Sequence, residues 1–282
     1  MKKIKVYINN SFDFHTEVVN SKHYRRTDPT YKDRVMALNE TVKEQFENHD
    51  TEFGRDNLAI LLPKNLNAQE KQDLLSLYNY DSKPFQKLNN ILTTSETGKR
   101  QPVCPFCTIN NVNTFDHLIP KTEFPELSDH PKNLMPCCSE CNSKKSSNWR
   151  IGNNRRYLNL YLDDLPDIQY LFVALNIESS TIHANFFIEN RFGIDINLYK
   201  RIENHYQDLE LCRRFAINSY NIISELQNIL TMSRDVIPAE DLKNIIIQAE
   251  NKNREIYGFN YWKSILKQEC CTNDNVFNFL IR

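Results

Sequence analysis

Hydrophobic residues recur three and four positions apart through much of the chain, a spacing that places them on one face of a helix. The pattern predicts a helix over residues 31–49, where the apolar positions are Val35, Leu38, Val42 and Phe46. Another helix is predicted to begin at Asn67, because Asn67 and Glu70 have the spacing of a capping box. The same reasoning predicts helices over residues 82–92, 196–232 (with one break), 238–251 and 259–268.

Strand patterns are short by comparison. Residues 3–8 alternate between apolar and polar side chains and predict a short strand. Residues 170–178 and 181–189 are rich in strand-forming residues and are joined at Ser179-Ser180, which predicts a hairpin. Residues 12–31 are polar, and we expect a loop there. With only five glycines in the whole sequence, these patterns favour a mainly helical protein.

The composition is that of a globular protein with a proper core, since 40% of the 282 residues are apolar and 25% are charged. A formal net charge of −1 creates no global attraction to nucleic acid or membrane, so any contact with phosphates must be local. No apolar run is long enough to span a membrane, and the N-terminus becomes polar too early for a signal peptide. We therefore expect a cytoplasmic protein without a membrane partner.

The cysteines point to a metal site in the middle of the chain. A tetrahedral structural Zn²⁺ needs four thiolates, and two C-x2-C pairs supply them: Cys104 with Cys107, and Cys138 with Cys141. The eight cysteines fit metal ligands and spare thiols in a reducing compartment better than a disulfide framework. Three others lack ligand spacing and are expected to be core filler or incidental thiols: Cys212, Cys270 and Cys271.

Further polar residues lie inside or next to the segment between the cysteine pairs, and the candidates for chemistry are Asp116, His117, Asn133 and Asn142. Short runs at residues 114–115 and 133–136 indicate two strands, and residues 142–149 indicate a helix. The predicted ββα unit buries too little apolar area to fold alone, so zinc would hold it together.

The order C-x2-C, DH, N, C-x2-C-N-x2-K resembles the HNH endonuclease family, also called the ββα-metal nucleases, over about residues 100–150. The residues that carry the resemblance are Cys104, Cys107, Asp116, His117, Asn133, Cys138, Cys141, Asn142 and Lys145. It implies that Asp116 and Asn142 bind a catalytic Mg²⁺ or Mn²⁺ ion. It also implies that His117 is the general base, that Asn133 bonds the surrounding loop and orients His117, and that cleavage leaves a 5′-phosphate and a 3′-hydroxyl.

These residue types suit the hydrolysis of a phosphodiester. Mg²⁺ prefers oxygen ligands and keeps several waters, so one carboxylate and one amide oxygen suffice. A histidine, with an ordinary pKa of about 6.5, can take a proton from the attacking water. Many zinc-bearing HNH modules have a histidine directly after the last cysteine, whereas this chain has Asn142, whose amide oxygen favours Mg²⁺ or Mn²⁺ over softer ions.

A basic strip follows the last cysteine. Residues 142–156 contain no acidic side chain, and their basic ones are Lys144, Lys145, Arg150, Arg155 and Arg156. Beside the proposed metal, such a strip predicts salt-dependent contact with a nucleic-acid backbone. The ordinary alternative for a charge run is a solvated face, and Trp149 is expected to cover the small core rather than stack on a base.

Several alternatives remain open. Paired C-x2-C knuckles also occur in purely structural zinc modules, which leaves a non-catalytic zinc-dependent nucleic-acid-binding or scaffold protein as one alternative. A ribonuclease effector, for example a tRNA-cleaving one, is another, because a ββα-metal site attacks phosphodiesters without testing for a 2′-hydroxyl. Cys137 could replace Cys138 as a ligand, although the spacing favours Cys138. His130 is also a candidate ligand, but its Asp-His-Pro setting indicates a solvated turn.

We therefore expect an α+β fold, a predominantly helical chain around a central zinc-stapled HNH module. Its predicted regions are a helix-rich N-terminal region (1–99), the HNH module (100–156) and a C-terminal hairpin with helices (157–282). The expected activity is metal-dependent hydrolysis of DNA rather than RNA. The layout, including residues 201–214, also resembles the stand-alone HNH nucleases of bacterial anti-phage systems of the Septu and retron-linked type, which implies an ATPase partner subunit.

Overall fold

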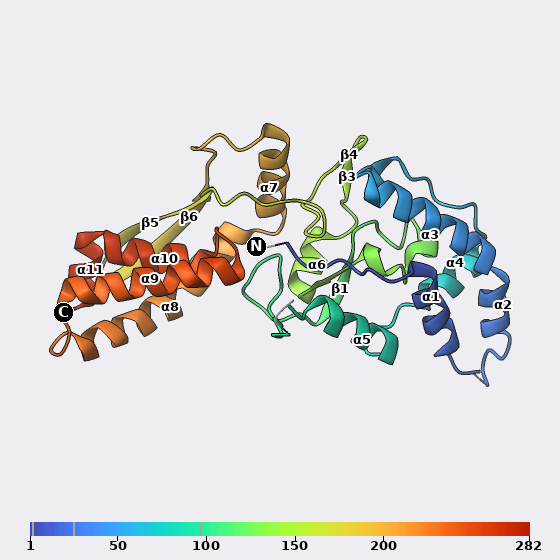
Figure 1. Cartoon of the computed structure of the whole chain (residues 1–282), viewed down its shortest axis with the longest axis horizontal. Coiled ribbons are helices and arrows are strands. Elements are labelled where there is room, and N and C mark those ends of the chain that lie inside the picture. The colour runs from blue at the N-terminus through green and yellow to red at the C-terminus, as the bar shows by residue number, and fades with distance from the viewer. Residues whose placement is uncertain (2, 25, 96–97) are drawn as a thin grey trace. The chain divides into compact units, whose positions relative to one another are not determined.

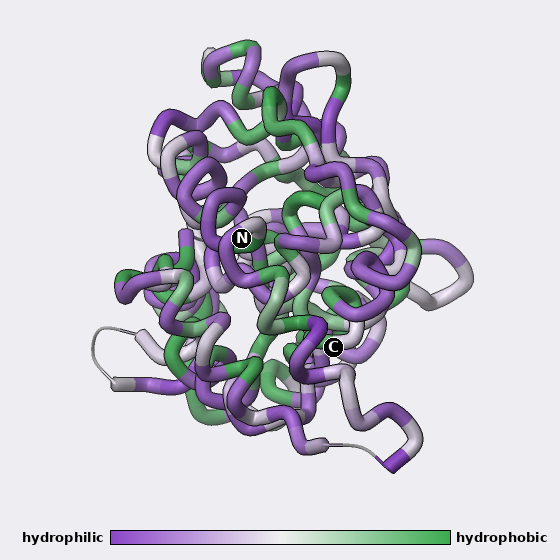
Figure 2. Tube along the Cα trace, turned by 90° about the vertical axis from the view of Figure 1, so that its right-hand side faces the viewer, coloured by the Kyte–Doolittle hydropathy of each residue, from purple (hydrophilic) through white to green (hydrophobic). Residues whose placement is uncertain are grey.

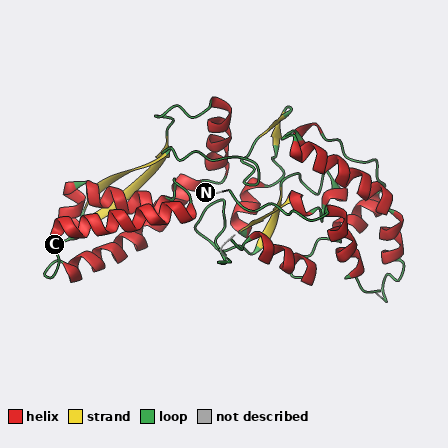
Figure 3. Ribbon diagram, in the orientation of Figure 1, coloured by secondary structure: helices red, strands yellow, loops and turns green. Residues whose placement is uncertain are grey.

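The computed structural model describes residues 1, 3–24, 26–95 and 98–282 of the chain, with its elements labelled in Figure 1. These residues form two compact units. The N-terminal unit comprises residues 3–106 and 110–163, and the C-terminal unit comprises residues 164–282 with residues 1 and 107–109. Helices predominate in both units, and the strands pair in two-stranded sheets (Figure 3). The predicted fold class, a mainly helical α+β chain around a small ββα module, is confirmed.

The N-terminal unit surrounds a small antiparallel sheet with helices. Its helices are α1 (Ser11–Asn20), α2 (Tyr31–Ala37), α3 (Asn39–Gly54), α4 (Ala68–Leu75), α5 (Lys83–Leu92) and α6 (Ser139–Lys145), with 3-10 turns η1 (Leu58–Ile60), η2 (Pro125–Leu127) and η3 (Pro131–Asn133). Its strands are β1 (Thr114–His117), β2 (Leu134–Cys137), β3 (Arg150–Ile151) and β4 (Asn154–Arg155).

Local signals account for several of these helices. The predicted capping box at α4 is confirmed, since the Asn67 side chain accepts from the backbone of Gln69 and Glu70 while Glu70 accepts from the backbone of Asn67. The expected loop over residues 12–31 is wrong for residues 12–20, because α1 begins at Ser11 after an Asn10 cap and buries an apolar face against α3 and α5. The expected strand over residues 3–8 is also wrong, since these residues form no sheet.

The central ββα unit is confirmed, with its helix shifted at both ends toward the N-terminus. Strands β1 and β2 pair antiparallel, so that Thr114 lies opposite Cys137 and His117 lies opposite Leu134. Helix α6 begins before the predicted residue 142, because the Cys138 sulfur caps it by accepting from the backbone N–H of Cys141. The helix ends at Lys145, where the next residue adopts a positive φ of 53°.

Residues 118–133 between β1 and β2, here called the connecting loop, are held by the N-terminal helices. Helices α3 and α4 contact η2, and α1 contacts η3. The Ser128 hydroxyl donates to the carbonyl oxygen of Leu74 at 2.7 Å, and the backbone N–H of Lys64 donates to the Glu126 carboxylate at 2.8 Å. The N-terminal helices therefore position the loop that leads away from Asp116-His117.

The C-terminal unit packs a hairpin against helices. Its elements are β5 (Leu171–Glu178), β6 (Thr181–Ile188), α7 (Ile196–Asp208), α8 (Leu211–Ser233), α9 (Ala239–Tyr257), α10 (Trp262–Thr272) and α11 (Asp274–Leu280). The predicted hairpin is confirmed, and both residues of its Ser179-Ser180 turn have positive φ. The predicted break between helices lies at Glu210, which also has positive φ. Trp262 stacks on Phe215 with ring centroids 5.2 Å apart, in the core where α8 and α10 meet.

Hydrophobic positions are interspersed with hydrophilic ones along the trace in Figure 2. Among the described residues, no helix combines the length and the apolarity that crossing a membrane requires.

Candidate active site

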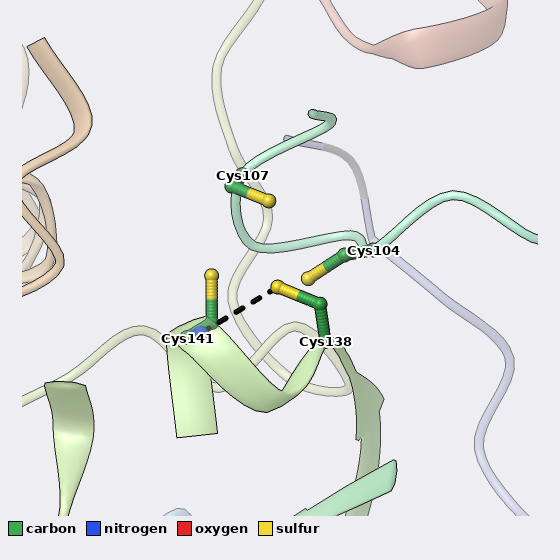
Figure 4. Close-up of side chains that lie close together, drawn as sticks. All are labelled: Cys104, Cys107, Cys138 and Cys141. Carbon is green, nitrogen blue, oxygen red and sulfur yellow. Dashed lines mark hydrogen bonds between the residues drawn. The ribbon is translucent and has the colours of Figure 1, made fainter. Parts of the chain in front are cut away.

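The four predicted cysteines come together. One sulfur from each lies within 4.8 Å of all the others, and every one of the four side chains is buried. Figure 4 shows the sulfur atoms turned toward one another, from the turn that carries Cys104 and Cys107 and from the start of α6. A tetrahedral site with Zn–S bonds of about 2.3 Å places its sulfurs about 3.8 Å apart. The donor set and its compactness therefore fit a structural Zn²⁺ ion.

Hydrogen bonds to sulfur support thiolate character in this group. The backbone N–H of Ile109 donates to Cys107 Sγ at 3.4 Å, and that of Cys141 donates to Cys138 Sγ at 3.5 Å. Cys137 is not a member of the four-cysteine group. Burial raises the pKa of the Cys137 thiol well above its usual value, as expected of an inert buried thiol.

Asp116 is a buried carboxylate with one partner. Its side chain lies at the end of β1 and is 1% exposed, and Oδ1 is 3.1 Å from the Lys145 ammonium. Oδ2 is also buried, and it has no hydrogen-bond partner among the described residues. Burial raises the pKa of Asp116, against the opposing effect of the Lys145 charge. An unpaired buried carboxylate oxygen is costly unless it meets a cation, so Asp116 fits a divalent metal.

His117 is held by its Nε2 atom. This nitrogen is 2.9 Å from the carbonyl oxygen of Ser128, to which it donates a hydrogen bond. A carbonyl only accepts, so the neutral ring carries its proton on Nε2 and keeps the lone pair on Nδ1. Burial lowers the pKa of His117 to about 3, and the Lys121 charge adds to this shift. The imidazole is therefore neutral near pH 7, with Nδ1 unprotonated.

The Asn133 side chain links two parts of the connecting loop by hydrogen bonds to the backbone of Ile119 and Leu127. Its Oδ1 accepts from the backbone N–H of Ile119 at 2.8 Å, and its Nδ2 donates to the carbonyl oxygens of Ile119 and Leu127 at 3.0 and 3.2 Å. The side chain is fully buried. These bonds join the residues that follow His117 to the residues that precede Ser128, the acceptor for the His117 ring.

Asn142 lies on α6 directly after Cys141 and is half-buried. Helix α6 packs against β1, the strand that carries Asp116 and His117. Among the described residues, the Asn142 side chain makes no hydrogen bond to Asp116 or His117. Its role as a metal ligand stays a prediction.

The basic strip differs from its expected form. Lys145 is 3% exposed and turns into the module, where it meets Asp116 and the carbonyl oxygen of His117, so it does not face a phosphate backbone. Arg150 pairs with Glu123 at 2.6 Å, and Arg155 pairs with Asp163 at 2.9 Å. The acidic partners Glu123 and Asp163 lie outside residues 142–156, so the composition of that stretch does not reveal them. The other two basic residues of the strip, Lys144 and Arg156, are half-buried.

The structure adds residues near His117 that the sequence patterns did not single out. The Tyr78 ring meets the His117 ring edge-on, with centroids 4.8 Å apart, and the Lys121 ammonium lies 4.3 Å from the centre of the Tyr78 ring. The Tyr78 hydroxyl accepts from the backbone N–H of Phe115. The available signal for Lys121 was its position four residues after His117.

Comparisons with known proteins agree with this geometry. The model of the family described as HNH endonuclease matches residues 104–148. Protein ea31 of Escherichia phage lambda is 25% identical to the chain over 186 residues, which cover 62% of each protein. The chain thus spans less than two thirds of the length of that relative. No solved structure matches. Residues 104–148 are therefore an HNH endonuclease domain, carried by a longer and mainly helical chain.

Proposed function

We propose that this protein is a metal-dependent endonuclease that hydrolyses DNA phosphodiester bonds. The observation that carries the proposal is that consecutive positions of β1 hold Asp116, whose buried Oδ2 has no partner among the described residues, and a neutral His117 with its tautomer fixed by Ser128. A histidine with a lone pair on Nδ1 and an unpaired carboxylate are residue types that suit metal-assisted hydrolysis. A purely structural zinc module needs neither.

In this proposal, Asp116 and Asn142 hold a Mg²⁺ or Mn²⁺ ion through oxygen atoms. The chemistry that such an ion supplies is neutralisation of charge on the phosphoryl oxygens and on the leaving oxygen. His117 Nδ1 takes a proton from the attacking water, while Nε2 keeps its bond to Ser128. Asn133 keeps the loop in place, and Lys145 balances the charge of Asp116. The expected products carry a 5′-phosphate and a 3′-hydroxyl.

Contact with the nucleic acid is assigned to the residues of the basic strip other than Lys145, which is buried. Lys144, Arg150, Arg155 and Arg156 are the strip residues proposed to meet the phosphate backbone. Arg150 and Arg155 would do so only if the substrate's phosphates displace their Glu123 and Asp163 partners. Such contacts make affinity fall as salt rises.

The biological setting is proposed from resemblance alone. The similarity of residues 201–214 to the anti-phage HNH nucleases supports a cytoplasmic defence role with an ATPase partner subunit. Plaque counts on cells that express the chain with such an ATPase test this role. The proposal expects fewer plaques for the native pair than for the pair with His117→Ala, and equal counts would remove it.

The activity is tested with end-labelled DNA and RNA of the same length and sequence, incubated with Mg²⁺, Mn²⁺ or EDTA. We expect cleavage of DNA with either ion and none with EDTA. Asp116→Asn should abolish it, whereas Asp81→Asn, which alters an exposed carboxylate of the same unit, should not. Cleavage of RNA alone would favour the ribonuclease. Binding without cleavage under every condition would favour the non-catalytic zinc protein.

A further inference from the structure

A second cluster of metal-ligating side chains lies in the N-terminal unit, away from the cysteines. It consists of His49 and Asp50 near the end of α3 and His130 at the start of η3. One ligand atom from each residue lies within 4.8 Å of the other two. Both histidines are fully buried, which corrects the expectation that His130 is a solvated turn residue.

The polar atoms of this cluster are poorly satisfied. Within the described part of the chain, neither ring nitrogen of His49 has a hydrogen-bond partner, and neither does Nε2 of His130. Asp50 Oδ1 faces both rings, 3.4 Å from His130 Nε2 and 4.0 Å from His49 Nδ1. A buried polar atom without a partner destabilises the fold, so several in one place call for a ligand.

The protonation states are those a metal site needs. Burial lowers the pKa of His49 to about 3, and the neighbouring His130 adds to the shift. Burial also lowers the pKa of His130. For Asp50 burial opposes ionisation, but the nearby His130, His49 and Lys132 lower its pKa below the usual range. The cluster is thus two neutral imidazoles and one carboxylate near pH 7.

The Asp50 carboxylate is already oriented. Its Oδ2 accepts from the Ser11 hydroxyl at 2.9 Å, which leaves Oδ1 facing the two histidines. An outer hydrogen bond of this kind is a regular feature of carboxylates that bind metals.

We propose that His49, Asp50 and His130 form a second zinc-type divalent cation site, separate from the four cysteines and from Asp116. Two imidazoles and one carboxylate form a donor set for Zn²⁺ and similar ions, with a fourth position for water. Two contacts change on binding. Lys132 Nζ, now 3.0 Å from Asp50 Oδ1, gives way to the ion, and the 3.3 Å contact from the Lys132 backbone N–H to His130 Nδ1 opens as that nitrogen takes the ring proton.

The site would join α3 to the connecting loop. His130 lies between Ser128, whose carbonyl accepts from the His117 ring, and Asn133, which closes the loop. An ion there would stabilise the loop that holds His117. This consequence rests on the proposed function, whereas the site itself does not.

The test is the metal content of the full-length protein after exposure to Zn²⁺ and removal of loose ions. We expect two zinc ions per chain, and one fewer in each of His49→Gln and His130→Asn. The control is His183→Asn, which alters an exposed histidine of the C-terminal unit and should keep both zinc ions. A single zinc ion in the unaltered protein would overturn the proposal whether or not the variants fold. Two ions retained by both folded variants would also overturn it.

Replacing zinc with Co²⁺ distinguishes the two sites without any cleavage assay. The cysteine site should show intense thiolate-to-cobalt absorption, and the second site only weak visible bands. His130→Asn should lose the weak bands and keep the intense ones. Identical spectra from the two proteins would contradict the assignment.

Discussion

The Lys145 ammonium donates a hydrogen bond to the main-chain carbonyl oxygen of His117 across 3.0 Å. The same nitrogen is 3.1 Å from Asp116 Oδ1. Lys145 is the last residue of α6, the helix that begins at the cysteine knuckle. One buried side chain therefore connects the zinc-binding end of the module to both proposed catalytic residues of β1.

Lys145→Met should lower the rate of DNA cleavage by about 10–100-fold, as expected for a residue that orients a metal ligand. The loss should be partly reversed by higher Mg²⁺ concentration, because Asp116 loses the contact that orients it for the ion. Lys144→Met is the matched control, since Lys144 is the adjacent, less buried lysine and should chiefly alter the salt dependence of binding. Unchanged cleavage and unchanged Mg²⁺ dependence in Lys145→Met would show that this contact is structural.

Loss of the structural zinc should unfold the ββα module. Cys141→Ser should contain one zinc ion fewer than the unaltered protein, and residues 134–145 should become accessible to proteases, because the short strands and α6 bury too little area alone. Cys212→Ser, outside the cluster, should behave like the native protein. Native protease resistance in a Cys141→Ser protein shown to lack that zinc would contradict this role.

Asn133→Ala should destabilise the protein by about 2–4 kcal/mol, because it leaves three buried backbone groups of the connecting loop without their partner. Urea unfolding measures the difference. Asn90→Ala, at an exposed position of α5, is the control and should change stability little. A similar small effect of both substitutions would mean that water replaces the Asn133 bonds.

Stability in acid should depend on the ion pair between Arg34 of α2 and Asp73 of α4. Hydrogen bonds from Arg34 hold the pKa of Asp73 below its usual 3.8, through contacts of 2.8 Å. A depressed carboxylate stabilises the folded state above its unfolded pKa, and this stability is lost as pH falls through the folded pKa. Below about pH 3.8 the free energy of unfolding should therefore fall with pH less steeply in Asp73→Asn than in the native protein. Asp33→Asn, exposed on α2, should retain the native slope.

Sequence patterns predicted the features that depend on neighbouring residues. The C-x2-C pairs, the Asn67 capping box and the Ser179-Ser180 hairpin are all determined within a few positions. The ββα unit could be predicted for the same reason, because its strands flank recognisable polar residues.

Features that depend on distant packing could not be predicted in this way. His130 is buried because α3 supplies His49, Asp50 and the Phe46 ring around it. Lys145 turns inward because β1 offers a carboxylate and a carbonyl oxygen, and Arg155 pairs with Asp163 from a later segment. In each case the partner lies outside the element that carries the residue, which no local periodicity reveals.

The measurement that tests the central claim most directly is single-turnover cleavage of supercoiled plasmid with Mg²⁺ or Mn²⁺, by native protein and by His117→Ala at matched zinc content. We expect nicked or linear DNA from the native protein and a rate about 10²–10⁴-fold lower from the variant, the range for loss of a general base. The ends produced should carry a 5′-phosphate. Equal rates for the two proteins would contradict the role of His117 and with it the proposed mechanism.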